Sequence, residues 1–284
     1  MAGVHARGEG HGDGHATRPS VAQISGEILL TISAILALFV VYELHWTDLT
    51  SARLQARAAT DLDERWAGRH DQTDPAAAAT PAPLPPPVLG EAFARVHLPA
   101  LGTDAHYVVV EGTRPEDLRT GPGHYEETQL PGEPGNIALA GHRNGSGGVF
   151  EHLDRLAPCD AVVMETATQW LTYRLVPDEV EPAARRATAG QCLSPEQVER
   201  FAVGDYSHVR GLHVTTPDAV EVIAPLPGVT GAGGAESTVG PGLERMLTLT
   251  TCHPLYSNAE RLIVHAVLTD TTSKSAGLPD ALEE

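Results

Sequence analysis

Two apolar runs near the end of the chain alternate in the way that β-strands do. Residues 247–252 read Leu-Thr-Leu-Thr-Thr-Cys. Because successive side chains of a strand point to opposite faces, the two leucines share one face and Cys252 lies on the other. Pro254 has no N–H with which to continue the strand. A second run at 262–268 follows Arg261, so a hairpin would place Cys252 opposite Arg261 at one end of a sheet.

The same pattern upstream predicts several short strands. One apolar stretch ends just before His142, and short helices are expected to begin near Pro115 and Pro195 and within Phe150–Leu156. Many short strands with Gly and Pro turns between them are typical of a closed barrel or a sandwich. The remaining strand candidates are Phe93–Leu98, His106–Val110, Ala161–Glu165 and Trp170–Val176.

One segment near the start of the chain is apolar enough to cross a bilayer. Residues 28–42 read ILLTISAILALFVVY, and the stretch reaches about 20 residues when it is extended to Trp46. No small-residue cleavage site follows, so we predict a signal anchor at 28–46 rather than a cleaved signal peptide. The flanking arginines favour the opposite orientation to an exported C-terminus, because more of them follow the segment than precede it.

Composition divides the rest of the chain. Residues 1–27 are rich in Gly, His and polar residues and are predicted to be a disordered tail. Residues 47–90 are predicted to form a juxtamembrane helix and then a Pro- and Ala-rich linker. The folded domain is expected at 91–270, and a flexible tail at 271–284.

Charge and cysteine content limit the classes of function. The formal net charge of −18 argues against a nucleic-acid partner. The three cysteines, Cys159, Cys192 and Cys252, have no neighbouring Cys or His at zinc-ligand spacing, and we predict no metal site and no cofactor. An odd number of cysteines outside the cytoplasm fits one disulfide and one free thiol.

Three short motifs carry a resemblance to a known family. They are Thr-Leu-Thr-Thr-Cys at 248–252, Leu-Ala-Gly-His-Arg at 139–143, and Arg261 at the start of the following strand. In this order they resemble the sortases, cysteine transpeptidases of Gram-positive cell surfaces. The longer stretches GPGHY, PGEPGNIALAGHR, TLTTCHP and ERLIVHA are most similar to class E, the group common in actinobacteria.

The resemblance implies a fold and a location. The fold would be all-β, an eight-stranded β-barrel with short helices, preceded by one N-terminal transmembrane helix. The protein would cross the cell membrane once, with its N-terminus in the cytoplasm and its catalytic domain outside. This implication takes precedence over the arginine count.

The resemblance also implies a reaction and its partners. A sortase cleaves surface proteins after the Thr of a C-terminal sorting signal of the LPxTG or LAxTG kind. It then transfers the protein to an amine of a peptidoglycan precursor or of a pilin. The expected partners are therefore sorting-signal proteins, an acceptor amine and the lipid bilayer.

The residue types fit this chemistry. A thiolate at Cys252 can attack a peptide carbonyl and later leave, and a nearby cation lowers the pKa of a thiol. His142 would protonate the departing amine and deprotonate the incoming one. Arg261 stays charged, so it would donate hydrogen bonds to the oxyanion instead of acting as a base.

Four further residues near the motifs are weaker candidates. Thr250, Thr251 and His253 are predicted to contact substrate, although the threonines would equally serve local packing or hydrogen bonding. Arg143 is expected to be a solvated or structural charge.

Two departures from the family pattern leave alternatives open. Class E members usually have a tyrosine after Leu-Ala-Gly-His-Arg, whereas residues 144–148 are Asn-Gly-Ser-Gly-Gly, which leaves the signal preference open. Residues 183–214 look like an insertion, either one that shapes specificity or a tolerated surface excursion. A Cys159–Cys192 disulfide would fix it in place, and two unpaired thiols are the alternative.

Two other functions compete with transpeptidation. One is a cysteine peptidase that only hydrolyses its substrate. The other is a sortase-fold protein that has lost turnover and acts as a surface binding or scaffold module.

Overall fold

The computed structural model describes residues 20–67, 80–229 and 242–283. It divides the chain into two units, Met1–Glu43 and Leu44–Glu284, which are considered separately. Most of the tail predicted to be disordered, up to residue 19, lies outside the described residues.

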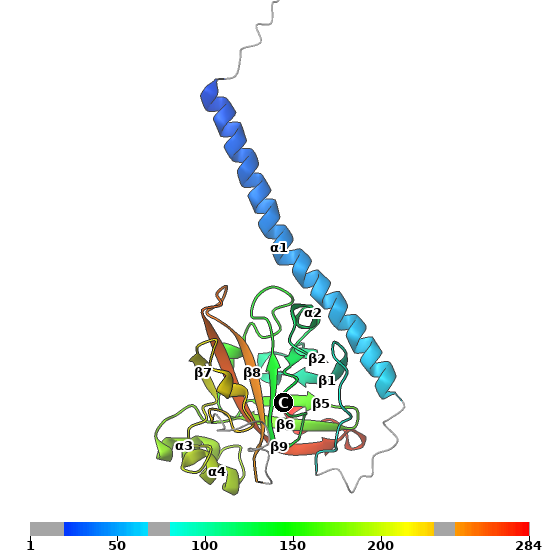
Figure 1. Cartoon of the computed structure of the whole chain (residues 1–284), viewed down its shortest axis with the longest axis vertical. Coiled ribbons are helices and arrows are strands. Elements are labelled where there is room, and N and C mark those ends of the chain that lie inside the picture. Colours follow the sequence, from blue (N-terminus) through cyan, green and yellow to red (C-terminus); the bar gives the residue numbers. More distant parts are fainter. Residues whose placement is uncertain (1–19, 68–79, 230–241, 284) are drawn as a thin grey trace, which may run out of the picture. The chain divides into compact units, whose positions relative to one another are not determined.

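Helix α1 is continuous from Val21 to Trp66 (Figure 1). Its part Val21–Tyr42 is long and apolar enough to cross a membrane, judged by length and composition alone. The hydroxyl of Ser20 accepts a hydrogen bond from the N–H of Gln23 at 3.1 Å and so caps the helix. The helix thus begins upstream of the anchor predicted at 28–46 and includes residues 21–27, and the bounds of that anchor stay a prediction.

Eight strands close a β-barrel. The strands are connected in the order β6-β5-β1-β2-β3-β4-β8-β9, and β9 pairs back with β6. A ninth, β7, pairs only with the first part of β9 (Figure 1). The predicted fold is confirmed. The strands are β1 (Ala92–His97), β2 (His106–Glu111), β3 (Gly123–His124), β4 (Gly135–Ala140), β5 (Ala161–Glu165), β6 (Gln169–Leu175), β7 (Leu212–Thr215), β8 (Arg245–His253) and β9 (Glu260–Ser273).

The barrel is filled by one face of these strands. In β8, Leu247 and Leu249 are fully buried in the main core together with Ile137 and Leu139 of β4. The alternation in the sequence thus gives β8 a core face and an opposite face that carries Thr248, Thr250 and Cys252.

The second half of α1 packs against the barrel. Leu62 and Trp66 are buried in a cluster with Val108 and Val110 of β2. The side-chain amide of Gln55 accepts a hydrogen bond from the N–H of Val108 at 3.0 Å, much as a neighbouring strand would. The folded unit therefore begins well before the predicted boundary at residue 91, because the apolar side of this helix needs the barrel to cover it.

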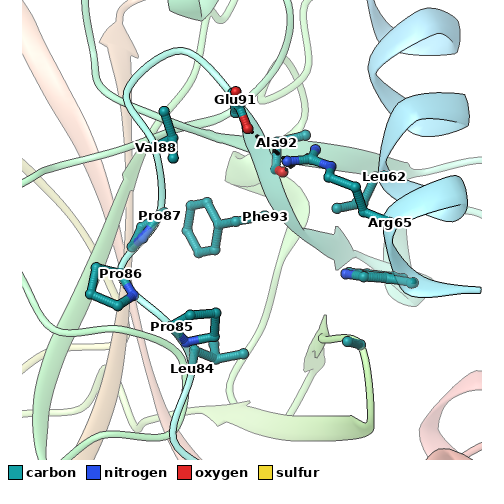
Figure 2. A pocket seen from close by; sticks show the side chains of 12 residues that line it. Leu62, Arg65, Leu84, Pro85, Pro86, Pro87, Val88, Glu91, Ala92 and Phe93 are labelled. Carbon is teal, nitrogen blue, oxygen red and sulfur yellow. Dashed lines mark hydrogen bonds and ion pairs between the residues drawn. The ribbon is translucent and has the colours of Figure 1, made fainter. Parts of the chain in front are cut away.

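The end of the Pro-rich linker also packs on the barrel. Residues 68–79 lie outside the described residues, but the side chain of Gln169 in β6 bonds to Thr80 and Ala82, with distances of 2.9 and 2.6 Å. Figure 2 shows Pro85–Pro87 passing beside Phe93 of β1, along a cavity of about 200 Å³. From Thr80 onward the predicted spacer is therefore part of the folded domain.

The insertion forms a small helical layer. Helices α3 (Pro182–Ala189) and α4 (Pro195–Ala202) lie side by side (Figure 1) and bury Phe201 in a second apolar cluster. The fully buried Arg185 donates hydrogen bonds to two backbone carbonyls of this segment, Phe201 and Val209, and to two that precede it, Pro177 and Glu179. One helix was predicted here, and the structure has two. Residues 212–214, predicted as the end of the insertion, belong to β7 and complete its pairing with β9.

A disulfide ties the insertion to the barrel. Cys159 and Cys192 are bonded, with their Cα atoms 5.7 Å apart and a sequence separation of 33. Loop closure of this length stabilises a folded chain by about 3–4 kcal/mol. Cys252 is the free cysteine.

The C-terminal segment is ordered. Strand β9 continues to Ser273 and is followed by two short 3-10 helices, η6 (Lys274–Ala276) and η7 (Asp280–Leu282). Ala281 is buried in a cluster with Trp170. The predicted flexible tail at 271–284 was therefore wrong up to residue 283, because the tail buries an apolar side chain and pairs its lysine with Glu165.

Candidate functional site

The hairpin predicted from the alternation is present at one end of the barrel. Strands β8 and β9 are antiparallel, and the residue opposite Cys252 is Arg261. Both side chains are half-buried. The thiol and the guanidinium therefore belong to neighbouring strands and are partly open to solvent.

His142 follows the strand on the other side of β8. Strands β4 and β8 are parallel, with Ala140 opposite Thr250. His142 lies two residues beyond Ala140, just past the end of β4, and Cys252 lies two residues beyond Thr250 within β8. The N–H of Gly141 donates to the carbonyl of Thr250 at 3.0 Å, which holds this segment against β8. The register thus brings His142, Cys252 and Arg261 to one edge of the sheet.

Packing around Gly141 fixes the backbone of His142. The N–H of Phe150 donates to the carbonyl of His142 at 3.0 Å. The Phe150 ring is fully buried, and one of its carbons lies 2.4 Å from where a Cβ of residue 141 would be. A side chain at position 141 would push this ring out of the core, so the glycine before the histidine has a structural reason.

His142 is suited to accept a proton. Burial lowers the pKa of its imidazole below the ordinary 6.5, because the charged form would lose hydration. The ring is therefore neutral at pH 7. It makes no side-chain hydrogen bond within the described residues, so no partner there competes for a proton.

Asn258 links the other two candidates. The thiol of Cys252 donates to Oδ1 of Asn258 at 3.4 Å, and Nη1 of Arg261 donates to the same oxygen at 2.7 Å. Asn258 is exposed in the loop that joins β8 to β9. It was not among the residues predicted from the sequence, because an asparagine in such a loop is an ordinary turn residue.

The Sortase domain family model matches residues 96–269, more than half of the chain. This range contains Cys252, His142 and Arg261. The chain belongs to the sortase family.

Two curated relatives are similar along most of this sortase. Sortase SrtE1 of Streptomyces coelicolor is 29% identical over 98% of this chain and 66% of the relative. Sortase SrtE2 of the same organism is also 29% identical, over 87% of this chain and 82% of the relative. The chain therefore spans just under two thirds of SrtE1. The resemblance to class E agrees with both names.

Solved structures share the fold. The SrtF sortase from Corynebacterium diphtheriae is 46% identical with a TM-score of 0.67, covering 75% of this chain and all of that one. The SrtA sortase from Actinomyces oris is 27% identical with a TM-score of 0.52, covering 71% of this chain and 93% of that one. The whole of the SrtF chain therefore matches a part of this one.

Two of the three threonines in the Thr-Leu-Thr-Thr-Cys motif, Thr250 and Thr251, make hydrogen bonds within the fold. The hydroxyl of Thr251 donates to the carbonyl of Gly141 at 2.7 Å. The hydroxyl of Thr250 is 3.0 Å from the phenol oxygen of Tyr125. Both threonines are buried. These contacts match the local role considered from the sequence, and a substrate role for either residue stays a prediction.

Arg143 is a buried charge behind the site. Its Nη1 donates to Nδ1 of His253 at 2.6 Å and lies 3.5 Å from the carbonyl oxygen of Cys252, while its Nη2 pairs with Asp154 at 3.0 Å. A guanidinium only donates hydrogen bonds, so His253 accepts through Nδ1 and carries its proton on Nε2. Arg143 is therefore a structural charge and not a solvated one. The substrate role of His253 stays a prediction.

The Gly-rich loop after Arg143 lies between two other segments. The side-chain oxygen of Asn144 accepts a hydrogen bond from the N–H of Tyr256 at 3.2 Å. On the other side, Cβ of Ser51 in α1 lies 3.5 Å from where a Cβ of Gly147 would be. This loop, which lacks the tyrosine usual in class E, thus lies between α1 and the β8–β9 loop.

Among the described residues, no cluster of three or more His, Cys, Asp or Glu side chains could hold a metal ion.

Proposed function

We propose that this sortase is a membrane-anchored transpeptidase that uses Cys252, His142 and Arg261. It cleaves a C-terminal sorting signal of the LPxTG or LAxTG kind after its threonine. It then transfers the surface protein to an amine of a peptidoglycan precursor or a pilin.

The observation that carries the proposal is the register around β8. Strand β4 on one side leads to His142, and β9 on the other begins with Arg261 opposite Cys252. This register supports the proposal, because Cys252 is paired with Arg261 across β8 and β9, and His142 lies two residues after the end of the strand that pairs with β8 on its other side.

The first half-reaction forms a thioester. The sulfur of Cys252 attacks the carbonyl carbon of the threonine as its proton passes to the neutral ring of His142. The carbonyl oxygen becomes an oxyanion, which the guanidinium of Arg261 stabilises by hydrogen bonds. The C–N bond then breaks, and the leaving nitrogen takes the proton from His142.

The second half-reaction reverses the proton transfers. The acceptor amine attacks the thioester carbon and gives a proton to His142. The C–S bond breaks, the thiolate leaves, and His142 returns the proton to it. Because the thiolate is a good leaving group, an amine can compete with water at this step.

The apolar segment of α1 supports the location. Val21–Tyr42 would hold the enzyme at the bilayer with its N-terminus in the cytoplasm and the barrel outside. The Cys159–Cys192 disulfide agrees with an exported domain, since disulfides persist in oxidising surroundings.

A peptide library tests the function. A chain beginning at Leu44 is given sorting peptides that vary at the second position, with and without an acceptor amine. We expect Thr–amine products with wild type and none with Cys252→Ala. Ser257→Ala, in the adjacent loop, is the control and should retain turnover.

Two results would overturn the proposal. Turnover that survives in Cys252→Ala would remove the cysteine from the chemistry. Products that contain only the free threonine carboxylate, whatever amine is added, would show a hydrolase. Cleavage of no peptide would favour the scaffold alternative.

A further inference from the structure

The side-chain oxygen of Asn258 lies between the thiol of Cys252 and the guanidinium of Arg261. Oδ1 of Asn258 lies 2.7 Å from Nη1 of Arg261 and 3.4 Å from Sγ of Cys252. Donors that stabilise an oxyanion typically lie about 2.7–3.1 Å from its position. The Asn258 oxygen therefore occupies a place that suits the oxygen of a peptide carbonyl about to be attacked by this thiol.

The identity of the atom follows from its neighbours. Arg261 can only donate hydrogen bonds, so the atom of the amide that faces it is the oxygen and not the nitrogen. The amide nitrogen of Asn258 makes no hydrogen bond within the described residues. The side chain is thus held through its oxygen alone, as a substrate carbonyl would be.

The guanidinium is only partly engaged. Besides Oδ1 of Asn258, Nη1 of Arg261 donates to the backbone carbonyl of Glu260 at 3.0 Å and lies 3.4 Å from the carbonyl of Asn258. Its Nε and Nη2 donate to no described residue. An incoming carbonyl would therefore meet a guanidinium that is already oriented, with one position filled by Asn258.

The loop that carries Asn258 is lightly attached. Asn258 and its neighbour Ala259 are exposed. The loop is held by the N–H of Tyr256 donating to Asn144 and by a short turn from Pro254 to Ser257. Displacing the Asn258 side chain needs no change in the barrel, so a substrate carbonyl can replace its oxygen.

We propose that Asn258 fills the carbonyl-oxygen position between Cys252 and Arg261 in the resting enzyme and yields it to the scissile carbonyl of the substrate. This inference rests on the proposed function of Cys252 and Arg261. It adds that the side-chain oxygen lowers the reactivity of the free thiol: it accepts the thiol proton, and would repel the thiolate.

Alkylation of the thiol tests the inference without a peptide. Cys252 is the free cysteine, so iodoacetamide reports on it directly. We expect Asn258→Ala to raise the alkylation rate at pH 7 about fivefold, the factor that corresponds to one ordinary neutral hydrogen bond. Asn144→Ala is the matched control: it frees the same loop without removing the oxygen, and should change the rate much less.

Peptide kinetics give the second readout. In Asn258→Ala the KM for a sorting peptide should fall about fivefold with kcat retained, because the substrate no longer displaces the side chain. Asn258→Asp places a carboxylate against Arg261, and kcat/KM should fall about tenfold or more, since charge-assisted bonds are stronger.

Several outcomes would overturn the inference. Unchanged alkylation and unchanged KM in Asn258→Ala would show that the oxygen blocks nothing. A collapse of kcat in that variant would show that Asn258 positions Arg261 for chemistry instead. A third outcome separates the two proposals. If no sorting peptide is turned over but Asn258→Ala still speeds alkylation, the proposed function is wrong, whereas the contact of Asn258 with the thiol is supported.

Discussion

The barrel carries two clusters of charged and polar side chains, and they differ in how completely their groups are paired. Around Glu165 on β5, the carboxylate accepts from Lys274 at 2.6 Å and from His97 at 3.0 Å, with Arg95 at 3.5 Å. Lys274 also lies over the ring of Trp66, with its nitrogen 4.2 Å from the ring centroid. Every charge in this cluster has a fixed partner.

The Cys252 end of the barrel is only partly paired. The ring of His142 makes no hydrogen bond to a described residue, and two nitrogens of Arg261 donate to none. The thiol has one long contact, to Asn258. A catalytic group needs an unused donor or acceptor for the substrate, so the incompletely paired cluster is the one that can do chemistry.

The pKa directions follow the same division. Burial alone would raise the pKa of Glu165, but hydrogen bonds from His97 and Lys274 and the charge of Arg95 outweigh it and lower the pKa to about 2. Glu165 is therefore fixed as a carboxylate. The pKa of His142 is lowered by burial without a charged partner, which leaves its proton exchange available to a substrate.

Apart from loss of the nucleophile itself, the largest expected effect comes from His142→Asn. Loss of a general acid–base group typically lowers kcat/KM by about 10²–10⁴-fold. Because the ring bonds to no described residue, the melting temperature should hardly change. In the wild type, activity should persist as pH falls below 6.5 and decline only as His142 protonates at its lowered pKa. Steady-state kinetics across pH, with melting curves, measure both.

A second histidine serves as the control. His106 is exposed, its Nδ1 lies 3.3 Å from the carbonyl oxygen of Thr103, and its ring stacks on that of His97, away from Cys252 in the sequence and on another strand. His106→Asn should leave kcat/KM and its pH profile unchanged. More than a tenth of wild-type activity in His142→Asn would contradict the assigned role.

Removal of α1, whose Trp66 packs against the cluster around Glu165, should lower the free energy of unfolding. A chain that begins at residue 91 lacks Leu62 and Trp66, whose burial is worth roughly 3–6 kcal/mol at about 1.5–3 kcal/mol for each large apolar side chain. Urea unfolding should show this loss relative to a chain that begins at Leu44. Leu62→Ala in the longer chain, expected to cost about 2–5 kcal/mol, tests the contact if the short chain does not fold. Equal stability of the long and short chains would show that the helix is not part of the domain.

The smallest expected effect on catalysis comes from Glu165→Gln. The folded pKa of about 2 lies below the ordinary 4.5, so the carboxylate contributes about 3 kcal/mol that is present above pH 4.5 and lost as pH falls towards 2. The variant should have a lower free energy of unfolding at pH 7. That free energy should depend less steeply on pH between 4.5 and 2 than it does in the wild type. The activity per folded molecule should be unchanged. Glu199→Gln, which removes an exposed ion pair with Arg186, should do much less. Lost activity in a folded Glu165→Gln protein would mean that the two clusters are coupled.

The parts of the molecule that could be predicted depend on local patterns. Alternation predicted the strands around Cys252 and their hairpin, whereas the eight-stranded barrel and the choice of His142 were implied by the resemblance to the sortases. Ala161–Glu165 was predicted with the bounds that the structure has. These features are encoded in neighbouring residues, so a single sequence contains them.

The parts that were missed depend on contacts between distant residues. Gln55 reaches Val108, and Arg143 is buried against His253, through pairings that no spacing in the sequence reveals. The contact of Asn258 with both Cys252 and Arg261 exists only once the β8–β9 loop is folded. The start of α1 at Val21 was not predicted, because the cap at Ser20 lies before the apolar run and not at its edge.

The central claim is that Cys252 forms a thioester with the threonine of a sorting signal. Intact-mass spectrometry of the chain from Leu44, quenched in acid during turnover of a peptide, tests it most directly. We predict an added mass equal to the peptide up to its threonine, located on Cys252, released by hydroxylamine and absent in Cys252→Ala. Peptide cleavage without any adduct on Cys252, or the same adduct in Cys252→Ala, would contradict the account.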